Sequence, residues 1–199
     1  MKKFDGMTNE ALALLYVKGN NGAFDELLSR TQDKLFTYIM FVVHDHDIAD
    51  DIFQETFLKV ITKLQQGQYT DSGKFMFWLT RIAHNCIMDW YRQQQSRHIL
   101  EPNADNDLQN LSMASVLDTY RESELINEQV LTDVKHIMEN LPAPQREVVY
   151  MRYYQQLSFK EIAQITGVSI NTSLGRMRYA LMNMRRMAKD FQIELALQA

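Results

Sequence analysis

Apolar positions recur every three or four residues along most of the chain, which is the spacing of amphipathic α-helices. No stretch shows the sustained apolar–polar alternation of a half-buried strand. Glycine and proline separate the periodic segments. The spacing predicts helices over residues 24–43, 48–64, 75–95, 124–140, 144–155, 159–166 and 170–189. We therefore expect an all-α protein.

A polar segment divides these helices into two groups. Residues 96–123 are polar and contain Pro102, which indicates a flexible linker between a domain of residues 10–95 and one of residues 124–190. The length of 199 residues, with 46% apolar side chains, allows two small cores. The sequence thus predicts two small helical domains on either side of a linker.

Charge is distributed unevenly around a net value of -4. Basic and acidic side chains number ten and twelve in residues 1–95, three and nine in residues 96–140, and eight and four in residues 141–199. An acidic middle would be repelled by a polyanion, whereas the basic C-terminal part would be attracted to one. Composition leaves open whether the acidic segment is more than a solvated linker.

Several classes of protein are disfavoured by the composition. A single cysteine, Cys86, cannot form an internal disulfide, and no apolar run reaches the roughly 18 residues needed to cross a bilayer. We expect a cytoplasmic protein that is neither exported nor inserted in a membrane. The sequence has no glycine-rich phosphate loop, nucleophile elbow or HExxH motif, so we expect no enzyme and no cofactor.

A metal-dependent hydrolase is one alternative, because His44, Asp45, His46 and Asp47 are consecutive. Neighbouring ligands on one turn rarely converge on a single ion without further ligands from elsewhere. The remaining histidines are scattered, and we therefore expect no metal site.

The helix predicted over residues 48–64 has two faces. Asp47 is expected to be its N-cap, and Ile52, Thr56 and Val60 belong to its buried stripe. Acidic, amide and apolar side chains share the other face, at Asp51, Gln54, Glu55 and Leu58. Such a face suits a partner helix. The spacing alone is equally compatible with a plain solvated surface.

The helix predicted over residues 75–95 carries an unusual second face. Its members mix cationic, amide and apolar groups: Lys74, Phe77, Arg81, Asn85, Met88 and Arg92. Cations bind phosphates, amides bind base edges, and flat apolar groups stack on unpaired bases, so the mixture is typical of a surface for single-stranded nucleic acid. Packing in the protein core is the alternative for its aromatic residues.

The C-terminal part has the pattern of a helix-turn-helix. Ser158 and Glu161 form a capping box, Gly167 supplies the turn, and Ser169 caps the helix that follows. The second helix and its continuation are basic, with Arg176, Arg178, Arg185, Arg186 and Lys189. Arg146 and Arg152 of the preceding helix are expected to be available for phosphates. A structural helical hairpin is the alternative.

Three motifs, DDIFQETFLKV, KFMFWLTRIAHNCIMDWYR and LPAPQREVVYMRYYQQLSFKEIAQITGVSINTSLGRMRYAL, resemble in sequence and order an extracytoplasmic-function sigma factor of bacterial RNA polymerase. The resemblance implies a sigma2 domain over residues 10–95, which would bind the clamp helices of the beta-prime subunit and open the minus-10 element. It implies a sigma4 domain over residues 124–190, which would read the minus-35 element. The implied partners are core polymerase, including its beta subunit, promoter DNA and an anti-sigma factor.

The resemblance also assigns residues. Asp51, Gln54 and Glu55 match polymerase-contacting positions, and the facial argument adds Leu58. Arg81 and Asn85 match positions that meet the non-template strand, and the loop from Gly67 to Gly73 resembles one that holds a flipped base. The full set of residues expected to bind DNA is Lys74, Phe77, Arg81, Asn85, Arg92, Ser169, Thr172, Arg176, Arg178 and Tyr179.

The recognition helix departs from the pattern of the family at three positions. The family commonly has a basic residue at Leu174, a small polar residue at Gly175 and an arginine at Tyr179. A glycine within a helix costs about 1 kcal/mol relative to alanine. Either a close approach of DNA to the backbone or a tight packing contact would justify Gly175.

The sequence therefore predicts an alternative sigma factor that acts only with core polymerase. The alternative is a helix-turn-helix regulator with an N-terminal sensing or dimerisation module, which would bind its promoter tightly by itself.

Overall fold

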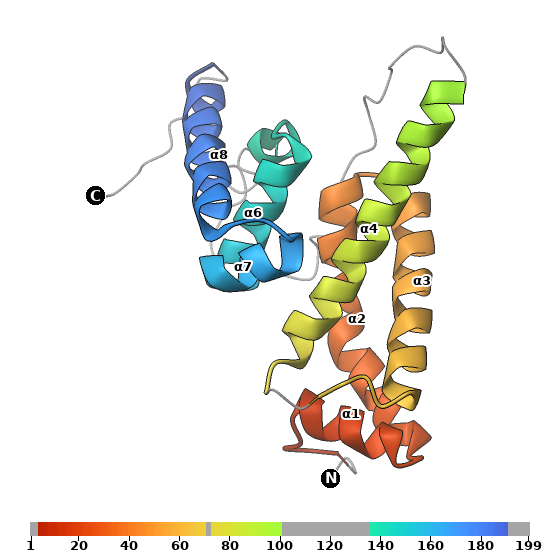
Figure 1. Cartoon of the computed structure of the whole chain (residues 1–199). Helices are drawn as coiled ribbons and strands as arrows, with labels where there is room; N and C mark the ends of the chain where they lie inside the picture. The colour runs from red at the N-terminus through yellow and green to blue at the C-terminus, as the bar shows by residue number, and fades with distance from the viewer. Residues whose placement is uncertain (1–3, 71–72, 101–135, 191–199) are drawn as a thin grey trace. The chain divides into compact units, whose positions relative to one another are not determined.

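The computed structural model describes residues 4–70, 73–100 and 136–190 (Figure 1). Every regular element in these ranges is an α-helix, and the chain divides into two units, Met1–Asn110 and Leu111–Ala199. The predicted all-α class with two helical units is confirmed. The boundaries predicted for the two domains and for the linker stay predictions, and residues 101–123 of that linker lie outside the described residues.

Four helices form the N-terminal unit: α1 (Asn9–Val17), α2 (Asn21–Val43), α3 (His46–Gln65) and α4 (Phe75–Leu100). Figure 1 shows α2, α3 and α4 as long helices with α1 across one end. The spacing of apolar residues did not predict α1. This helix begins after Thr8, whose hydroxyl accepts a hydrogen bond from the Ala11 N–H at 3.2 Å. In the same way α2 begins after Asn20, whose side-chain oxygen accepts a hydrogen bond from the Ala23 N–H.

The core of this unit lies between α2, α3 and α4. The predicted stripe of α3 is buried at Ile52, Thr56 and Val60, and α4 buries Leu79 and Ala83. Aromatic rings join the helices through edge-on contacts, such as Phe36 of α2 with Phe53 of α3 at 5.8 Å between ring centroids. The predicted stripe of α3 is therefore confirmed as the inner face of that helix.

The turn between α2 and α3 corrects the predicted start of α3. His44 ends α2 in the left-handed conformation, with φ 58°, and Asp45 follows in an extended conformation. Asp45 is the N-cap, because its Oδ1 accepts a hydrogen bond from the Ile48 N–H at 3.0 Å. The prediction of Asp47 as N-cap was wrong; Asp47 lies in the first turn, where its charge is favourable to the helix N-terminus.

The described part of the C-terminal unit contains α6 (Ala143–Tyr153), α7 (Phe159–Thr166) and α8 (Ile170–Asp190). Residues 136–139 are also helical and Asn140 lies in a turn; residues 124–135 of the helix predicted over residues 124–140 lie outside the described residues. Both α6 and α7 pack against α8, and Val148, Met151, Ile162 and Met177 are buried between them. This is the predicted helix-turn-helix with a supporting helix.

Arg146 has a different role from the one expected. Its side chain is buried, and Nη1 donates hydrogen bonds to the carbonyl oxygens of Glu139 at 2.9 Å and Leu141 at 3.3 Å. The guanidinium therefore ties α6 to the end of the preceding helical turn, and Arg146 is not available for phosphates. Arg152 is exposed, but its Nη1 donates to Leu157 O at 3.0 Å and its guanidinium lies over the Phe159 ring.

The connection between α6 and α7 contains a strained residue. Gln156 has φ 56°, in the left-handed region that costs a residue with a side chain roughly 1–2 kcal/mol. Gln156→Gly removes this strain. The greater backbone freedom of glycine partly offsets the gain, because it stabilises the unfolded state by up to about 1 kcal/mol. We expect the free energy of unfolding of the C-terminal unit to rise by about 0.5–1 kcal/mol, measured by hydrogen exchange of its core amides.

Gln164→Gly is the matched control for this prediction. Gln164 is also exposed but lies within α7, so the same substitution should lower stability by about 1 kcal/mol. Equal destabilisation by both variants would show that the turn does not depend on a left-handed residue.

Candidate functional site

The α3 face predicted to meet a partner is exposed in the structure. Asp51, Gln54 and Glu55 are all exposed, and Leu58 retains 66% of its accessible surface. Burial of Thr56 and Val60 on the opposite side fixes the rotation of the helix, so the four predicted side chains point away from the core together. An exposed leucine among carboxylates is suited to contact with a protein.

Ion pairs hold the edge of this face against α4. Glu55 Oε1 lies 2.7 Å from Lys59 Nζ, and the same Nζ lies 3.7 Å from Asp89 Oδ2 of α4. The hydrogen bond to Glu55 is the main reason that the pKa of Lys59 is raised, and Lys59 is therefore charged at neutral pH. The carboxylate of Glu55 is thus oriented by its neighbour one turn along the helix.

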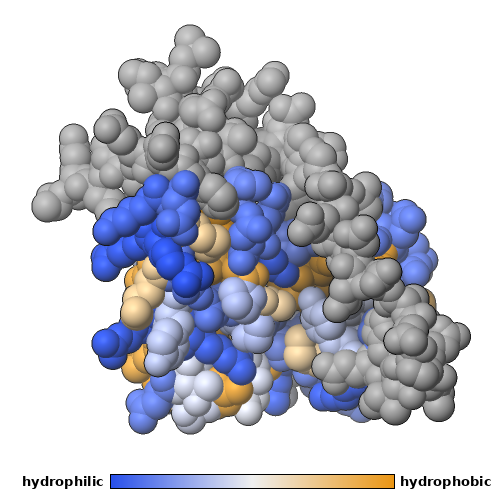
Figure 2. Space-filling model, turned by 90° about the horizontal axis from the view of Figure 1, so that it is seen from above, coloured by the Kyte–Doolittle hydropathy of each residue, from blue (hydrophilic) through white to orange (hydrophobic). Residues whose placement is uncertain are grey.

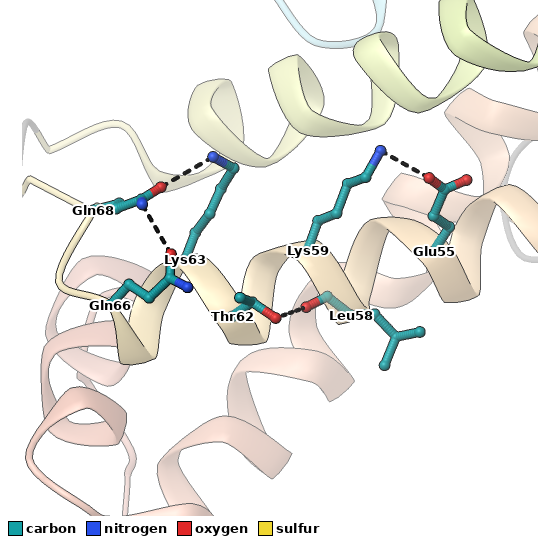
Figure 3. Close-up of a pocket in the computed structure, with 7 residues that line it drawn as sticks. All are labelled: Glu55, Leu58, Lys59, Thr62, Lys63, Gln66 and Gln68. Atoms are coloured by element: carbon teal, nitrogen blue, oxygen red, sulfur yellow. Dashed lines mark hydrogen bonds and ion pairs between the residues drawn. The ribbon is translucent and has the colours of Figure 1, made fainter.

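A shallow groove of about 340 Å³ extends the exposed face toward the end of α3 (Figure 3). In Figure 3, Leu58 points away from α4, whereas Lys59 and Lys63 extend toward it. Lys63 Nζ donates to Gln68 Oε1 at 3.1 Å, which ties the helix to the loop that follows. The groove is lined by Glu55, Leu58, Lys59, Thr62, Lys63, Gln66 and Gln68.

The later residues of this groove were not among the predicted site residues. Thr62 and Gln66 follow Leu58 at intervals of four, so they continue the same face by two more turns. The helical spacing that predicted Leu58 as part of this face would also have predicted these two residues if it had been followed to the end of the helix.

The loop between α3 and α4 is anchored at both described ends. Tyr69 is buried, with its ring 5.6 Å from the Phe75 ring and 4.9 Å from the Trp78 ring, measured between centroids. Gly67 and Gly73 both have φ 67°, which a residue with a side chain rarely adopts. Residues 71 and 72 of the predicted base-binding loop lie outside the described residues.

The first turn of α4 is capped by a residue from α1. Glu10 Oε1 accepts a hydrogen bond from the Phe75 N–H at 2.8 Å. Partial burial is the largest single influence on the pKa of Glu10 and raises it, but hydrogen bonds from Phe75, its own backbone and Thr8 outweigh burial and lower the pKa. A carboxylate at this position also favours the positive end of the helix dipole.

The predicted nucleic-acid face of α4 is only partly exposed. Lys74, Arg81 and Asn85 are exposed, whereas Phe77 and Met88 are half-buried and so belong in part to the core. Arg92 is exposed and pairs with Asp89, with Arg92 Nη1 at 2.6 Å from Oδ1. The cations and the amide are therefore accessible, and the apolar members are only partly so.

In the C-terminal unit, backbone and side-chain hydrogen bonds define both helix starts. Glu161 N donates to Ser158 Oγ at 3.3 Å and Ser158 N donates to Glu161 Oε2 at 2.9 Å, which confirms the capping box. Gly167 ends α7 with φ 67°. Ser169 caps α8, because its Oγ accepts from Thr172 N at 3.0 Å.

The face of α8 opposite its core side contains most of the predicted recognition residues. Ser169, Thr172, Arg178 and Tyr179 are exposed, whereas Arg176 is half-buried. The hydroxyl groups of Ser169 and Thr172 lie 2.8 Å apart and hydrogen-bond to each other. Leu174 and Met182 are also exposed, at 43% and 53%, although neither was predicted to be a site residue.

Among the residues that the structure describes, no group of three or more His, Cys, Asp and Glu side chains is arranged to hold a metal ion. Asp45 caps α3, and His46 Nδ1 lies 3.4 Å from Asp50 Oδ2 one turn further along. None of the described helices is both long and apolar enough to cross a membrane.

Comparison with known proteins assigns both units to one family. Residues 27–97 match the family model of sigma-70 region 2, and residues 131–181 match that of sigma-70 region 4. The ECF RNA polymerase sigma-E factor of Haemophilus influenzae is 28% identical over 85% of this chain and 89% of its own length. RNA polymerase sigma factor SigZ of Bacillus subtilis is 27% identical over 77% of this chain and 80% of its own.

A solved structure has the same fold. The sigma factor RpoE of Bartonella quintana, crystallised with the anti-sigma factor NepR, has a TM-score of 0.66 at 22% identity, over 83% of this chain and 96% of that one. The chain therefore belongs to the sigma-70 family of RNA polymerase sigma factors, in its extracytoplasmic-function group.

The contact between Glu10 and α4 gives a pH-dependent prediction. Because the folded pKa is below its ordinary value of 4.5, the ionised carboxylate contributes stability above about pH 4.5, and this contribution is lost as the pH falls through the folded value. Glu10→Gln should lower the free energy of unfolding by about 1 kcal/mol at pH 7, the lower part of the range for caps because Glu10 is partly exposed.

Urea unfolding followed by tryptophan fluorescence measures this effect, because Trp78 and Trp90 both lie on α4. The difference between wild type and variant should disappear below the folded pKa. A difference of the same size at pH 3 and at pH 7 would contradict the role of the charge.

Proposed function

We propose that this protein is an alternative sigma factor that directs core RNA polymerase to specific promoters and initiates transcription there. The exposed α3 face of Asp51, Gln54, Glu55 and Leu58 carries the proposal, because it lies on region 2 and combines carboxylates with an exposed apolar side chain. A regulator with only a helix-turn-helix and a sensing module would not account for region 2.

The α3 face is the proposed contact with the clamp helices of the beta-prime subunit. Its carboxylates would bind basic side chains, and Leu58 would become buried against the partner. The beta subunit is the second proposed polymerase contact. The chemistry of RNA synthesis belongs to the polymerase, so we assign no catalytic residue to this chain.

The two units would bind different forms of promoter DNA. Lys74, Arg81 and Asn85 are accessible on α4 for the unpaired strand near the minus-10 element, with Phe77 and Arg92 at the edges of that face. On α8, Ser169, Thr172, Arg176, Arg178 and Tyr179 would meet duplex DNA at the minus-35 element. The helix caps support this role, because they hold the N-terminus of α8 in a fixed conformation.

An anti-sigma factor is the proposed regulator. One solved structure of similar fold is the complex of the sigma factor RpoE with the anti-sigma factor NepR, and another is the complex of CnrH with the cytosolic domain of CnrY. Such a partner would act by covering the surfaces that otherwise meet polymerase. Because polymerase and chromosome share the cytoplasm, we place the protein there, associated with the nucleoid through polymerase.

Reversing one charge on the α3 face tests the polymerase contact. Asp51→Lys should weaken binding to core polymerase at least tenfold and reduce promoter-dependent transcripts by a similar factor, because like charges across an interface cost several kcal/mol. Asp33→Lys is the matched control, since Asp33 is an exposed carboxylate of α2 outside the proposed face. If the two variants transcribe equally well, this face is not the polymerase contact.

Removing one cation from α8 tests the DNA contact. Arg178→Ala should weaken promoter binding by the complex with core polymerase, and the slope of log affinity against log salt concentration should fall by about 0.9 per lost phosphate contact. Lys34→Ala, at an exposed position of α2, should leave the slope unchanged. The account predicts unaltered affinity for core polymerase in both variants; an unaltered salt slope in Arg178→Ala would exclude a phosphate contact.

A further inference from the structure

Gly175 differs from the other glycines of the chain. Five of the seven glycines have a positive φ, between 67° and 94°, and for these the backbone conformation explains the residue. The remaining two, Gly22 and Gly175, lie within helices without a positive φ. A glycine in a helix needs another explanation, because alanine is the better helix former.

Packing within the chain does not explain Gly175. A Cβ at Gly22 would lie 3.6 Å from Asn20 Oδ1 and 3.7 Å from the Phe4 ring, whereas a Cβ at Gly175 would meet no heavy atom within 4 Å. The sequence left two explanations open for Gly175. Among the described residues, the structure excludes one of them, a tight packing contact. The position is open on the side from which a partner would approach.

The neighbours of Gly175 on the exposed face of α8 carry hydroxyl and cationic groups. Thr172 lies three residues before it and Tyr179 four residues after, so all three share one face of α8. Tyr179 is 61% exposed, and Arg178 beside it is also exposed. Ser173, Met177 and Ala180 are buried on the opposite side. Gly175 thus lies in the middle of a cationic, hydroxyl-bearing face that directly follows the turn of the helix-turn-helix.

We propose that Gly175 is the point of closest approach between the backbone of α8 and duplex DNA, and that its missing side chain sets how deeply α8 enters the major groove. This inference rests on the proposed function of the C-terminal unit. A methyl group here would hold the helix away by about the length of one carbon–carbon bond, roughly 1.5 Å. Hydrogen bonds from Thr172 and Tyr179 to base edges do not survive a displacement of that size.

The proposal makes Gly175 a specificity-determining position. Long cationic side chains are flexible, so their contacts with phosphates tolerate a small shift of the helix. Hydrogen bonds to base edges do not tolerate such a shift. A side chain at position 175 should therefore weaken selective binding more than it weakens general attraction to DNA.

Gly175→Ala separates this role from a structural one. Alanine fits the open space and favours the helix, so the melting temperature of the C-terminal unit should rise by a few degrees. Gly22→Ala is the matched control, a helical glycine in the N-terminal unit whose Cβ would make ordinary van der Waals contacts. Each full-length variant is combined with core polymerase and a pool of genomic DNA fragments of the source organism, and the promoter-initiated transcripts are sequenced.

We expect Gly175→Ala to lose at least tenfold in promoter-initiated transcripts while it melts at a higher temperature and binds core polymerase normally. Gly22→Ala should transcribe like the wild type. Full activity of Gly175→Ala beside an active wild type would overturn this inference and leave the sigma-factor proposal standing. A wild type that gives no promoter-initiated transcript would instead overturn both.

Discussion

Burial of one stripe along α3 determines which residues of that helix remain exposed. Thr56, Val60 and Leu64 have no accessible surface, because they pack against the neighbouring helices. A buried Val or Leu side chain contributes about 1.5–3 kcal/mol, whereas an exposed ion pair such as Glu55–Lys59 contributes at most about 1 kcal/mol. The core therefore sets the rotation of α3, and the exposed Asp51–Leu58 face is its consequence.

The same separation into an inner and an outer side produces a surface of different chemistry in the C-terminal unit. There α8 buries Met177 and Ala180 and exposes cations and hydroxyl groups. In the view of Figure 2, hydrophilic residues cover much of the described surface, and hydrophobic residues show between them as smaller areas. An acidic and apolar face on one unit and a basic face on the other suit a protein partner and a nucleic-acid partner respectively.

Much of the fold follows from helical periodicity and capping residues, and the exceptions have physical reasons. The sequence identified the long helices because their apolar positions keep one period over five or more turns, and it identified the α7–α8 turn because Ser158, Gly167 and Ser169 each have a strong positional preference. It missed α1, because its run ALALLYV is apolar on every side of the helix and offers no polar face by which a helical period could be recognised. Asp45 and Asp47 are both good caps, and only the left-handed conformation at His44 decides between them.

The site was predictable where it depends on a helix face and unpredictable where it depends on contacts across the fold. Exposure of Asp51, Gln54, Glu55 and Leu58 follows from the period of α3 alone. The capping of α4 by Glu10 joins residues 65 positions apart. The side chain of Arg146 turns back to carbonyl groups just before α6, which helical spacing does not indicate. The open space beside Gly175 also needed coordinates, because a sequence does not show what a missing side chain would touch.

The dependence of promoter binding on core polymerase tests the central claim most directly. Fluorescence anisotropy at one fixed salt concentration can measure the binding of a labelled promoter fragment and of a labelled scrambled fragment. Each fragment is titrated once with the full chain alone and once with the chain plus core polymerase. The account predicts that the chain alone binds both fragments weakly and alike, and that preference for the promoter arises only with core polymerase. Tight, promoter-selective binding by the chain alone, unchanged by core polymerase, would contradict it.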